Sequence, residues 1–121
     1  MLPLFPRLRF FLYSAPADMR KGFDGLSGII THALHHDPTN GDGYIFINRR
    51  RDRMKLLIWD RSGFWLLYKR LEKGTFQMPP NPSQQSSIEL SYDVLIMLLE
   101  GIDVTRIKRR PRYQQNSKLP G

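Results

Sequence analysis

Three strand-like segments follow one another closely in the middle of the chain, and they constrain the fold more than any other feature. They lie at 44–48, 54–59 and 64–71, and each is rich in Ile, Leu and aromatic residues mixed with polar ones. The links between them, 49–53 and 60–63, are short enough for hairpins. The stretch therefore predicts an antiparallel meander. Because segment 54–59 is apolar on both faces, we expect it to be a central strand that is at least partly covered on both sides.

A strand and a helix are expected before this meander. Residues 8–13 are rich in aromatic residues and predict a first strand. Asp18 indicates the start of a helix, either as its cap or within its first turn. The turn-forming sequence 37–43 predicts that this helix ends near residues 34–36. Apolar residues recur between these limits at the spacing of one helix face: Met19, Phe23, Leu26, Ile30 and Ala33.

Two short strands and a second helix are expected after the meander. Residues 74–78 and 88–90 predict the strands, and a polar linker that contains prolines separates them. Ser91 or Asp93 is expected to cap the second helix, which Gly101 ends. The helix carries an apolar stripe broad enough to cover one sheet face: Val94, Leu95, Leu98, Leu99 and Ile102.

Together these elements predict an α+β fold: a small single domain with an antiparallel sheet of four to five strands and two packed helices. The domain is expected to span 1–104, followed by a basic tail at 105–121 that has little to bury and is expected to be disordered on its own. Apolar runs are far shorter than the ~18 residues of a membrane helix, and the N-terminus does not resemble a signal peptide. We therefore expect a cytoplasmic protein that does not contact a membrane.

The charge of the chain is concentrated in two places. The formal net charge is +8 and the isoelectric point is about 10.2. Residues 49–73 carry a net charge of +6, residues 104–121 carry another +6, and residues 74–103 carry −4. Such clustering indicates a polyanionic partner rather than an evenly solvated surface.

An arginine-rich hairpin is the strongest functional signal among the residues themselves. The guanidinium group contacts phosphate with two parallel hydrogen bonds, and a two-stranded ribbon fits the major groove of DNA. The basic tail resembles a flexible arm that becomes ordered on phosphates or in a minor groove. The candidate nucleic-acid-binding residues are Arg20, Lys21, Arg49, Arg50, Arg51, Arg53, Lys55, Arg61, Lys69, Arg70, Lys73, Arg106, Lys108, Arg109, Arg110 and Arg112.

Two further patterns have a functional and a structural interpretation. Glycines recur every third residue in the first predicted helix, either to approach a phosphate backbone or, as we favour, to pack tightly on the sheet: Gly22, Gly25 and Gly28. Aromatic side chains of the third meander strand could stack on unpaired bases, although packing in the core is the favoured interpretation: Phe64, Trp65 and Tyr68.

Catalytic and metal-binding patterns are weak. The chain has no cysteine, no nucleophile with an evident base and no phosphate-binding glycine loop. A metal site could be imagined from His32, His35, His36 and Asp37, and a two-metal nuclease site from Asp18, Asp24, Asp60 and Asp93. Each of these residues has a simpler role in a turn, a cap or a solvated helix surface. We therefore predict no enzyme activity, no metal and no cofactor.

Four segments resemble the motifs of a known family in their order and spacing. They are 18–26 (DMRKGFDGL), 44–60 (YIFINRRRDRMKLLIWD), 63–76 with its Gly63-Phe64-Trp65 start, and 98–103 (LLEGID). This pattern is similar to the TnpB-type accessory protein of the insertion-sequence-66 family of bacterial transposable elements. The resemblance covers residues 8–103, and departs from the family at the proline-bearing linker and the basic tail.

The resemblance implies a small protein that is encoded beside a much larger transposase and is needed for efficient transposition. It carries over no catalytic residue. Combined with the charge pattern, it predicts a non-enzymatic accessory protein that binds DNA, at element ends, through the basic hairpin. The implied partners are DNA, the transposase and a further element-encoded protein. The alternatives are an adaptor that docks on the transposase through 88–103 without binding DNA, and a small metal-dependent nuclease.

Overall fold

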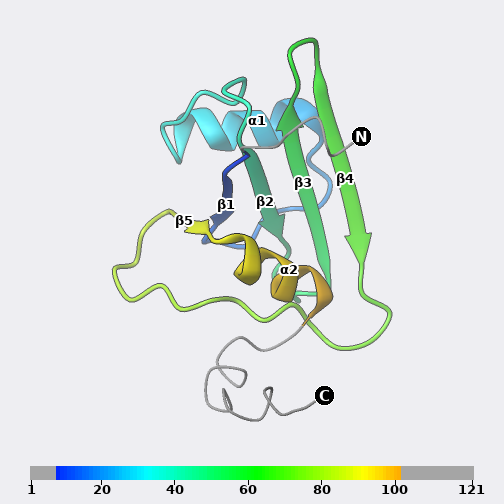
Figure 1. Ribbon diagram of the computed structural model, residues 1–121. Coiled ribbons are helices and arrows are strands. Elements are labelled where there is room, and N and C mark those ends of the chain that lie inside the picture. The colour runs from blue at the N-terminus through cyan, green and yellow to red at the C-terminus, as the bar shows by residue number, and fades with distance from the viewer. Residues whose placement is uncertain (1–7, 102–121) are drawn as a thin grey trace, which may run out of the picture.

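The computed structural model describes residues 8–101, which form one five-stranded sheet and two helices (Figure 1). The strands lie side by side in the order β4-β3-β2-β1-β5. Along the chain the elements are β1 (Phe10–Tyr13), α1 (Phe23–His32), β2 (Gly43–Ile47), β3 (Arg53–Trp59), β4 (Phe64–Arg70), β5 (Ser87–Leu90) and α2 (Tyr92–Glu100). This is the predicted small α+β domain.

The sheet is mostly antiparallel, as predicted, but one strand pair is parallel. Strands β2, β3 and β4 form the expected meander, and β5 pairs antiparallel with β1 at the other edge. The exception is the pairing of β1 with β2. The chain between them contains α1, which returns it to the same end of the sheet, and such a crossover produces a parallel pair.

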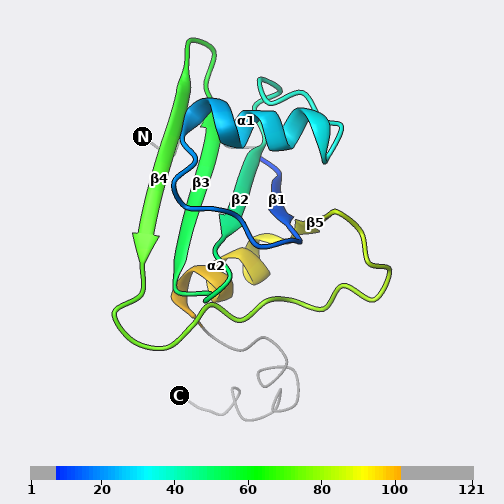
Figure 2. The ribbon, with the colours of Figure 1, turned by 180° about the vertical axis from the view of Figure 1, so that it is seen from behind.

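The two helices cover opposite faces of the sheet, as a comparison of Figures 1 and 2 shows. On the α1 side, Leu26 and Ile30 are fully buried in a cluster with Phe46 and Leu57. On the α2 side, Leu95 and Leu98 pack with other core residues: Leu12, Ile45, Ile47, Met54, Leu56, Ile58, Phe76 and Leu90. Strands β2 and β3 are consequently buried on both faces, which confirms the prediction of a doubly covered central strand.

The start of α1 differs from the prediction. The helix begins at Phe23, and Asp18 instead forms a turn in which its Oδ1 accepts a hydrogen bond from the Arg20 N–H (2.9 Å). Aspartate side chains often compete with the helix in this way. As a result, Met19 precedes the helix and Ala33 is its exposed C-cap. The side chain of Phe23 is also exposed, so fewer residues of the predicted apolar face of α1 are buried than expected.

The segment after the meander contains one wrong prediction and two confirmed ones. Residues 74–78 form no strand, and Phe76 is instead fully buried with its N–H donated to the carbonyl of Arg51 (2.7 Å). The edge strand β5 and the helix α2 are present as expected. Of the two candidate caps, Ser91 is the one that accepts a hydrogen bond, from the Val94 N–H, and Gly101 ends α2 in a left-handed conformation.

Candidate nucleic-acid interface

The fold brings two basic segments together at one end of the sheet. Arg53 at the start of β3 lies directly opposite Arg70 at the end of β4. The Leu71 N–H donates to the carbonyl of Asp52 (2.8 Å), so the chain leaving β4 contacts the β2–β3 turn. We call the cationic residues gathered there the basic end: Arg49, Arg50, Arg51, Arg53, Arg70 and Lys73.

Asn48 holds the β2–β3 turn in one conformation. Its Oδ1 accepts hydrogen bonds from the N–H groups of Asp52 and Arg53, both at 3.0 Å. Its Nδ2 donates to Asp52 Oδ1 at 2.7 Å. This side-chain hydrogen bond is the main reason that the pKa of Asp52 is lowered, and the nearby charges of Arg50 and Arg53 act in the same direction. The turn that presents the arginines is therefore well ordered before any ligand binds.

Arg51 adopts a left-handed backbone conformation in this turn, with φ of 61°. For a residue with a Cβ atom this conformation costs about 1–2 kcal/mol, and glycine avoids most of the cost. The Arg51 N–H donates to the carbonyl of Asn48 (3.0 Å) and its carbonyl accepts from Phe76. A strained arginine where glycine would be more stable is the kind of feature that accompanies a functional site.

Two hollows adjoin the basic end. The larger, about 380 Å³, lies between the turn and the segment before α1 and is lined by Ala17, Asp18, Met19, Asn48, Arg49, Arg50, Asp52 and Arg53. The smaller, about 170 Å³, is lined by Ser14, Ala15, Pro16, Ile47, Asn48, Arg49, Arg51 and Met78. Arg49 lines both hollows, so the arginines of the turn lie beside concave surface.

The turn arginines have no carboxylate partner among the described residues. Within 8–101 the ion pairs of the candidate cations are Arg70 with Glu72 (3.0 Å) and Arg20 with Asp18 (2.8 Å). The hydrogen bond from Arg20 lowers the pKa of Asp18 to about 2. No salt bridge within 8–101 involves the four arginines of the turn and of the start of β3, and all four are exposed: Arg49, Arg50, Arg51 and Arg53. Their charge is thus available to an anionic ligand.

Lys55 has a structural role, which corrects its prediction as a nucleic-acid contact. Its side chain is only 8% exposed, and its Nζ donates to the carbonyls of Met19 and Lys21 at 2.8 Å each. The ammonium also lies 4.8 Å from the centre of the Tyr68 ring. Lys55 therefore fixes the segment before α1 onto the sheet. The strand alternation, which places Lys55 on the same face as Leu57, was a usable signal of this role.

The other predicted cations lie in separate places. Lys69 remains exposed, but its Nζ donates to the carbonyl of Leu99 (2.7 Å), where a cation stabilises the C-terminus of α2. Arg61 lies in the β3–β4 turn, at the opposite end of the sheet from the basic end (Figure 1). Arg20 and Lys21 are exposed just before α1. The five predicted tail residues lie outside the described residues: Arg106, Lys108, Arg109, Arg110 and Arg112.

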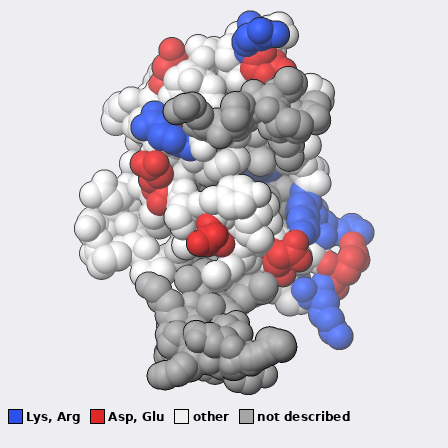
Figure 3. Space-filling view, in the orientation of Figure 1, with Lys and Arg blue, Asp and Glu red and all other residues white. Residues whose placement is uncertain are grey.

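The α2 side of the molecule has a different charge pattern (Figure 3). The largest group of Lys and Arg side chains on this face lies at its lower right edge, near the end of β4, with acidic side chains among them. Residues 74–101, which include α2, contain Glu89, Asp93 and Glu100 but no Lys or Arg. The surface formed by residues 74–101 is therefore unsuited to phosphate binding, in contrast to the basic end.

The glycines of the first helix do not pack tightly on the sheet, so that interpretation is wrong. A Cβ atom at Gly22 or Gly28 would meet nothing within 4 Å, and one at Gly25 would meet only the side chain of Lys21. Gly43 in β2 is the position where close packing excludes a side chain, because a Cβ there would lie 2.6 Å from the Phe10 ring. Approach of α1 to a phosphate backbone stays a prediction.

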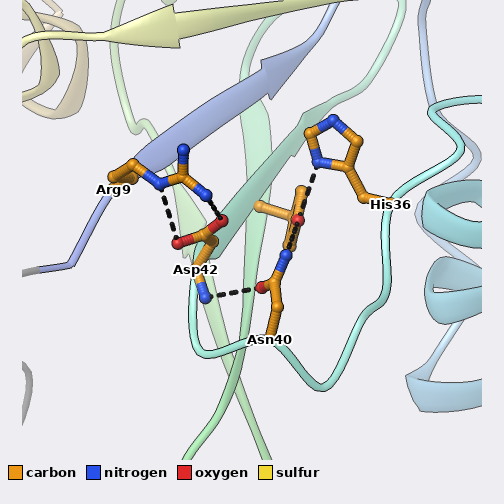
Figure 4. Close-up of polar contacts among 5 residues, drawn as sticks. Arg9, His36, Asn40 and Asp42 are labelled. Carbon is orange, nitrogen blue, oxygen red and sulfur yellow. Dashed lines mark hydrogen bonds and ion pairs between the residues drawn. The ribbon is translucent and has the colours of Figure 1, made fainter.

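Of the three histidines, His36 has a structural contact. His36 Nδ1 and the Tyr44 hydroxyl are 2.9 Å apart, and Asn40 donates to the same hydroxyl (Figure 4). Next to them, Arg9 forms an ion pair with the buried Asp42 (2.9 Å). His32, His35 and Asp24 are exposed. In the part of the chain that the structure describes, no group of three His, Asp or Glu side chains could hold a metal ion.

The aromatic residues of β4 are divided between core and surface. Phe64 is partly buried and packs edge-on against Trp59, as the favoured interpretation expected. For Trp65 and Tyr68 that interpretation is wrong, because they are 44% and 53% exposed. Sequence alternation could not indicate this, because the exposure arises from the position of β4 at the edge of the sheet.

Comparison with known proteins places the chain in a family. The family model of the IS66 Orf2-like proteins matches residues 8–109. Two curated proteins of Sinorhizobium fredii (strain NBRC 101917 / NGR234) are similar: the uncharacterised protein y4jC is 38% identical over 104 residues, covering 86% of this chain and 87% of that protein. The uncharacterised protein y4hO is 32% identical over 103 residues, covering 85% and 88%. No solved structure matches.

The fold and the basic end define a small α+β protein with a preformed cationic surface. The family match spans most of the chain, and so the chain belongs to the IS66 Orf2-like family of TnpB-type accessory proteins. This membership confirms the resemblance seen in the four sequence motifs and gives the chain a transposition-associated accessory role. Neither helix within the described residues is long and apolar enough to cross a membrane.

Proposed function

We propose that this protein is a non-enzymatic accessory protein of transposition that binds DNA through the basic end, at or near the ends of the element. One observation carries the proposal. Four arginines without carboxylate partners in the described residues lie in and next to a turn that Asn48 and Phe76 hold in place. Because the backbone of the turn is already held, contact with phosphates has to order only the arginine side chains, whose hydrogen bonds to phosphate are charge-assisted.

The proposed contact set differs from the one that the charge pattern alone predicts. It consists of the basic end with the exposed Arg20 and Lys21, and the basic tail provides further phosphate contacts. Lys55 is excluded because its ammonium is engaged inside the fold. Arg61 is too far along the sheet to share one phosphate surface with the turn. The protein acts in the cytoplasm, together with the transposase that the element encodes.

The test is fluorescence anisotropy with the full chain, a labelled duplex from an element end and a scrambled duplex of equal length, at several salt concentrations. If six phosphates are contacted, affinity falls by about 10³-fold between 50 and 200 mM salt. Tighter binding to the element end supports end recognition, and equal, salt-dependent binding supports a nonspecific clamp. Absence of binding to both duplexes at low salt contradicts the proposal.

A protein–protein adaptor is the second candidate, and the surface of α2 favours it. Tyr92 and Ile96 are 70% and 39% exposed in a segment that carries only acidic charges. Such a surface suits docking on a basic, partly apolar partner such as the transposase. In a pull-down with the transposase, the double variant Tyr92→Lys, Ile96→Glu loses binding if this candidate is right. The matched variant Phe23→Lys keeps it, because Phe23 is also exposed but lies on α1, across the sheet from α2.

A further inference from the structure

Strand β4 leaves one of its edges unpaired within the described residues. It is an outer strand of the sheet, and no described element lies beside its outer edge in Figures 1 and 2. With seven residues, β4 is as long as the central strand β3. Three of the six large apolar side chains that the structure exposes belong to it: Trp65, Leu67 and Tyr68. A long, apolar, unpaired strand edge is a typical site for adding another strand.

The direction of the backbone groups on β4 follows from its pairing with β3. Asp60 donates to the Gly63 carbonyl (3.0 Å) and Leu71 donates to the Asp52 carbonyl (2.8 Å), and both pairs belong to the same register. In an antiparallel pair, successive residues point their N–H and C=O groups alternately to the partner and away from it. The outward groups of β4 therefore belong to Phe64, Leu66, Tyr68 and Arg70.

We propose that β4 pairs antiparallel with β4 of a second copy of this chain, about a two-fold axis at Leu67. Only this register pairs the whole strand with itself. It places Phe64 opposite Arg70, Trp65 opposite Lys69, Leu66 opposite Tyr68, and Leu67 opposite Leu67. The residues with outward backbone groups then face one another, and each such pair exchanges two hydrogen bonds.

The side chains support a second copy as the occupant. In this register Leu67 and its counterpart, and Trp65 and Lys69, form the pairs without backbone hydrogen bonds, in which side chains lie closest. The exposed apolar side chains of the α2 side, Trp65 and Leu67, thereby cover each other. Lysine at a strand edge usually discourages pairing. Here Lys69 faces an indole ring rather than another cation, and cation–aromatic pairs of this kind are favourable.

The two-fold arrangement also has a geometric consequence. Because the two β4 strands run in opposite directions, the basic ends of the two copies lie at opposite ends of the joined strands. The dimer forms without DNA, so its test is independent of the proposed function.

Sedimentation velocity of the full chain without DNA tests the proposal. We expect the wild type to sediment at twice the mass of the 14.2 kDa chain. Leu67→Glu opposes two carboxylates at the axis and is expected to sediment as a monomer, whereas Ile96→Glu, at an exposed position of α2, remains a dimer. An equimolar mixture of Leu67→Glu and Leu67→Lys recovers the dimer. A wild type that sediments at the monomer mass contradicts the proposal. This holds even if the β4 edge pairs with a strand of another protein, such as the transposase.

A cysteine variant measures the register directly and does not depend on how Leu67→Glu folds. The chain has no native cysteine, and opposed residues in pairs without backbone hydrogen bonds are close enough for a disulfide. Under mild oxidation Leu67→Cys is expected to form a disulfide dimer about tenfold faster than Ile96→Cys, because its thiols are already adjacent. Equal rates for the two variants contradict pairing at Leu67.

Discussion

The two turns of the meander share one backbone feature but have different surroundings. Arg51 in the β2–β3 turn and Arg61 in the β3–β4 turn both have a left-handed backbone, with φ of 61° and 79°. The first turn receives hydrogen bonds from Leu71 and Phe76 and lies next to Arg70. The second carries a single cation, and its Asp60 accepts from the Trp65 indole (2.6 Å). A strained arginine is therefore not sufficient for a phosphate-binding surface, which requires several segments to bring their cations together.

The largest effect is expected at Lys55, which lies close to the β2–β3 turn in sequence but serves the fold. Lys55→Met leaves the carbonyls of Met19 and Lys21 without their donor. We expect a loss of about 2–4 kcal/mol in the free energy of unfolding, because two hydrogen bonds from a charged donor are lost. Urea denaturation measures it, with the exposed Lys73→Met as the control that changes stability little. Equal effects of the two substitutions would contradict the structural role of Lys55.

The side chains that hold the two turns are expected to differ in importance. Asn48→Ala removes three side-chain hydrogen bonds from the β2–β3 turn, two accepted by Oδ1 and one donated by Nδ2, and should cost about 2 kcal/mol. Asp60→Ala removes the exposed hydrogen bond from the Trp65 indole in the β3–β4 turn and should cost less than about 1 kcal/mol. Thermal unfolding of both variants gives the comparison. A larger cost at Asp60 would show that the second turn is the better ordered one.

Replacing the strained arginines with glycine separates stability from binding. Arg51→Gly and Arg61→Gly should each change the free energy of unfolding by no more than about 1 kcal/mol. Glycine relieves the strain of the left-handed backbone, which stabilises the fold, but it also raises the entropy of the unfolded chain, which opposes that gain. Arg51→Gly is expected to weaken DNA binding more than Arg61→Gly. Chemical denaturation and anisotropy on the same samples test both halves. Equal losses of affinity in the two variants would remove the distinction between the turns.

The smallest effect is expected in acid, where both turns lose support in the same way. Hydrogen bonds from Asn48 and Trp65 lower the pKa values of Asp52 and Asp60 below the ordinary 3.8. Because the folded-state pKa lies below the unfolded one, this stabilisation is present above pH 4 and is lost as the pH falls through the folded-state pKa. Carboxyl titration by NMR should show that Asn48→Ala raises the pKa of Asp52 and leaves that of Asp60 unchanged.

Much of this fold could be predicted because its signals are local. The alternation in the meander, the short hairpin links, the Ser91 cap and the terminal Gly101 each depend on a few neighbouring residues. The parallel pairing of β1 with β2 could not be predicted in this way, since it joins segments that are distant in sequence. The turn at Asp18 was missed because a helix cap and an aspartate turn use the same residue type.

The location of the candidate site could be predicted from the sequence, but the residues that belong to it could not. The clustered charge indicated the hairpin. The register of β3 and β4 places Arg70 next to the β2–β3 turn and Arg61 at the other end of the sheet. The exposure of Trp65 and Tyr68 follows from the edge position of β4, which no pattern within the strand specifies. Lys55 is the residue that closer use of strand alternation would have assigned to the interior.

The most direct test of the central claim is the salt dependence of DNA binding after the β2–β3 turn is neutralised. In the triple variant Arg49→Gln, Arg50→Gln, Arg53→Gln, the slope of log affinity against log salt should fall by about 2–3, since each phosphate contact contributes about 0.9. Arg61→Gln should lower the slope by no more than about 0.9, the contribution of a single phosphate contact. An unchanged slope in the triple variant, with the fold intact by circular dichroism, would contradict the assignment of the basic end as the DNA-binding surface.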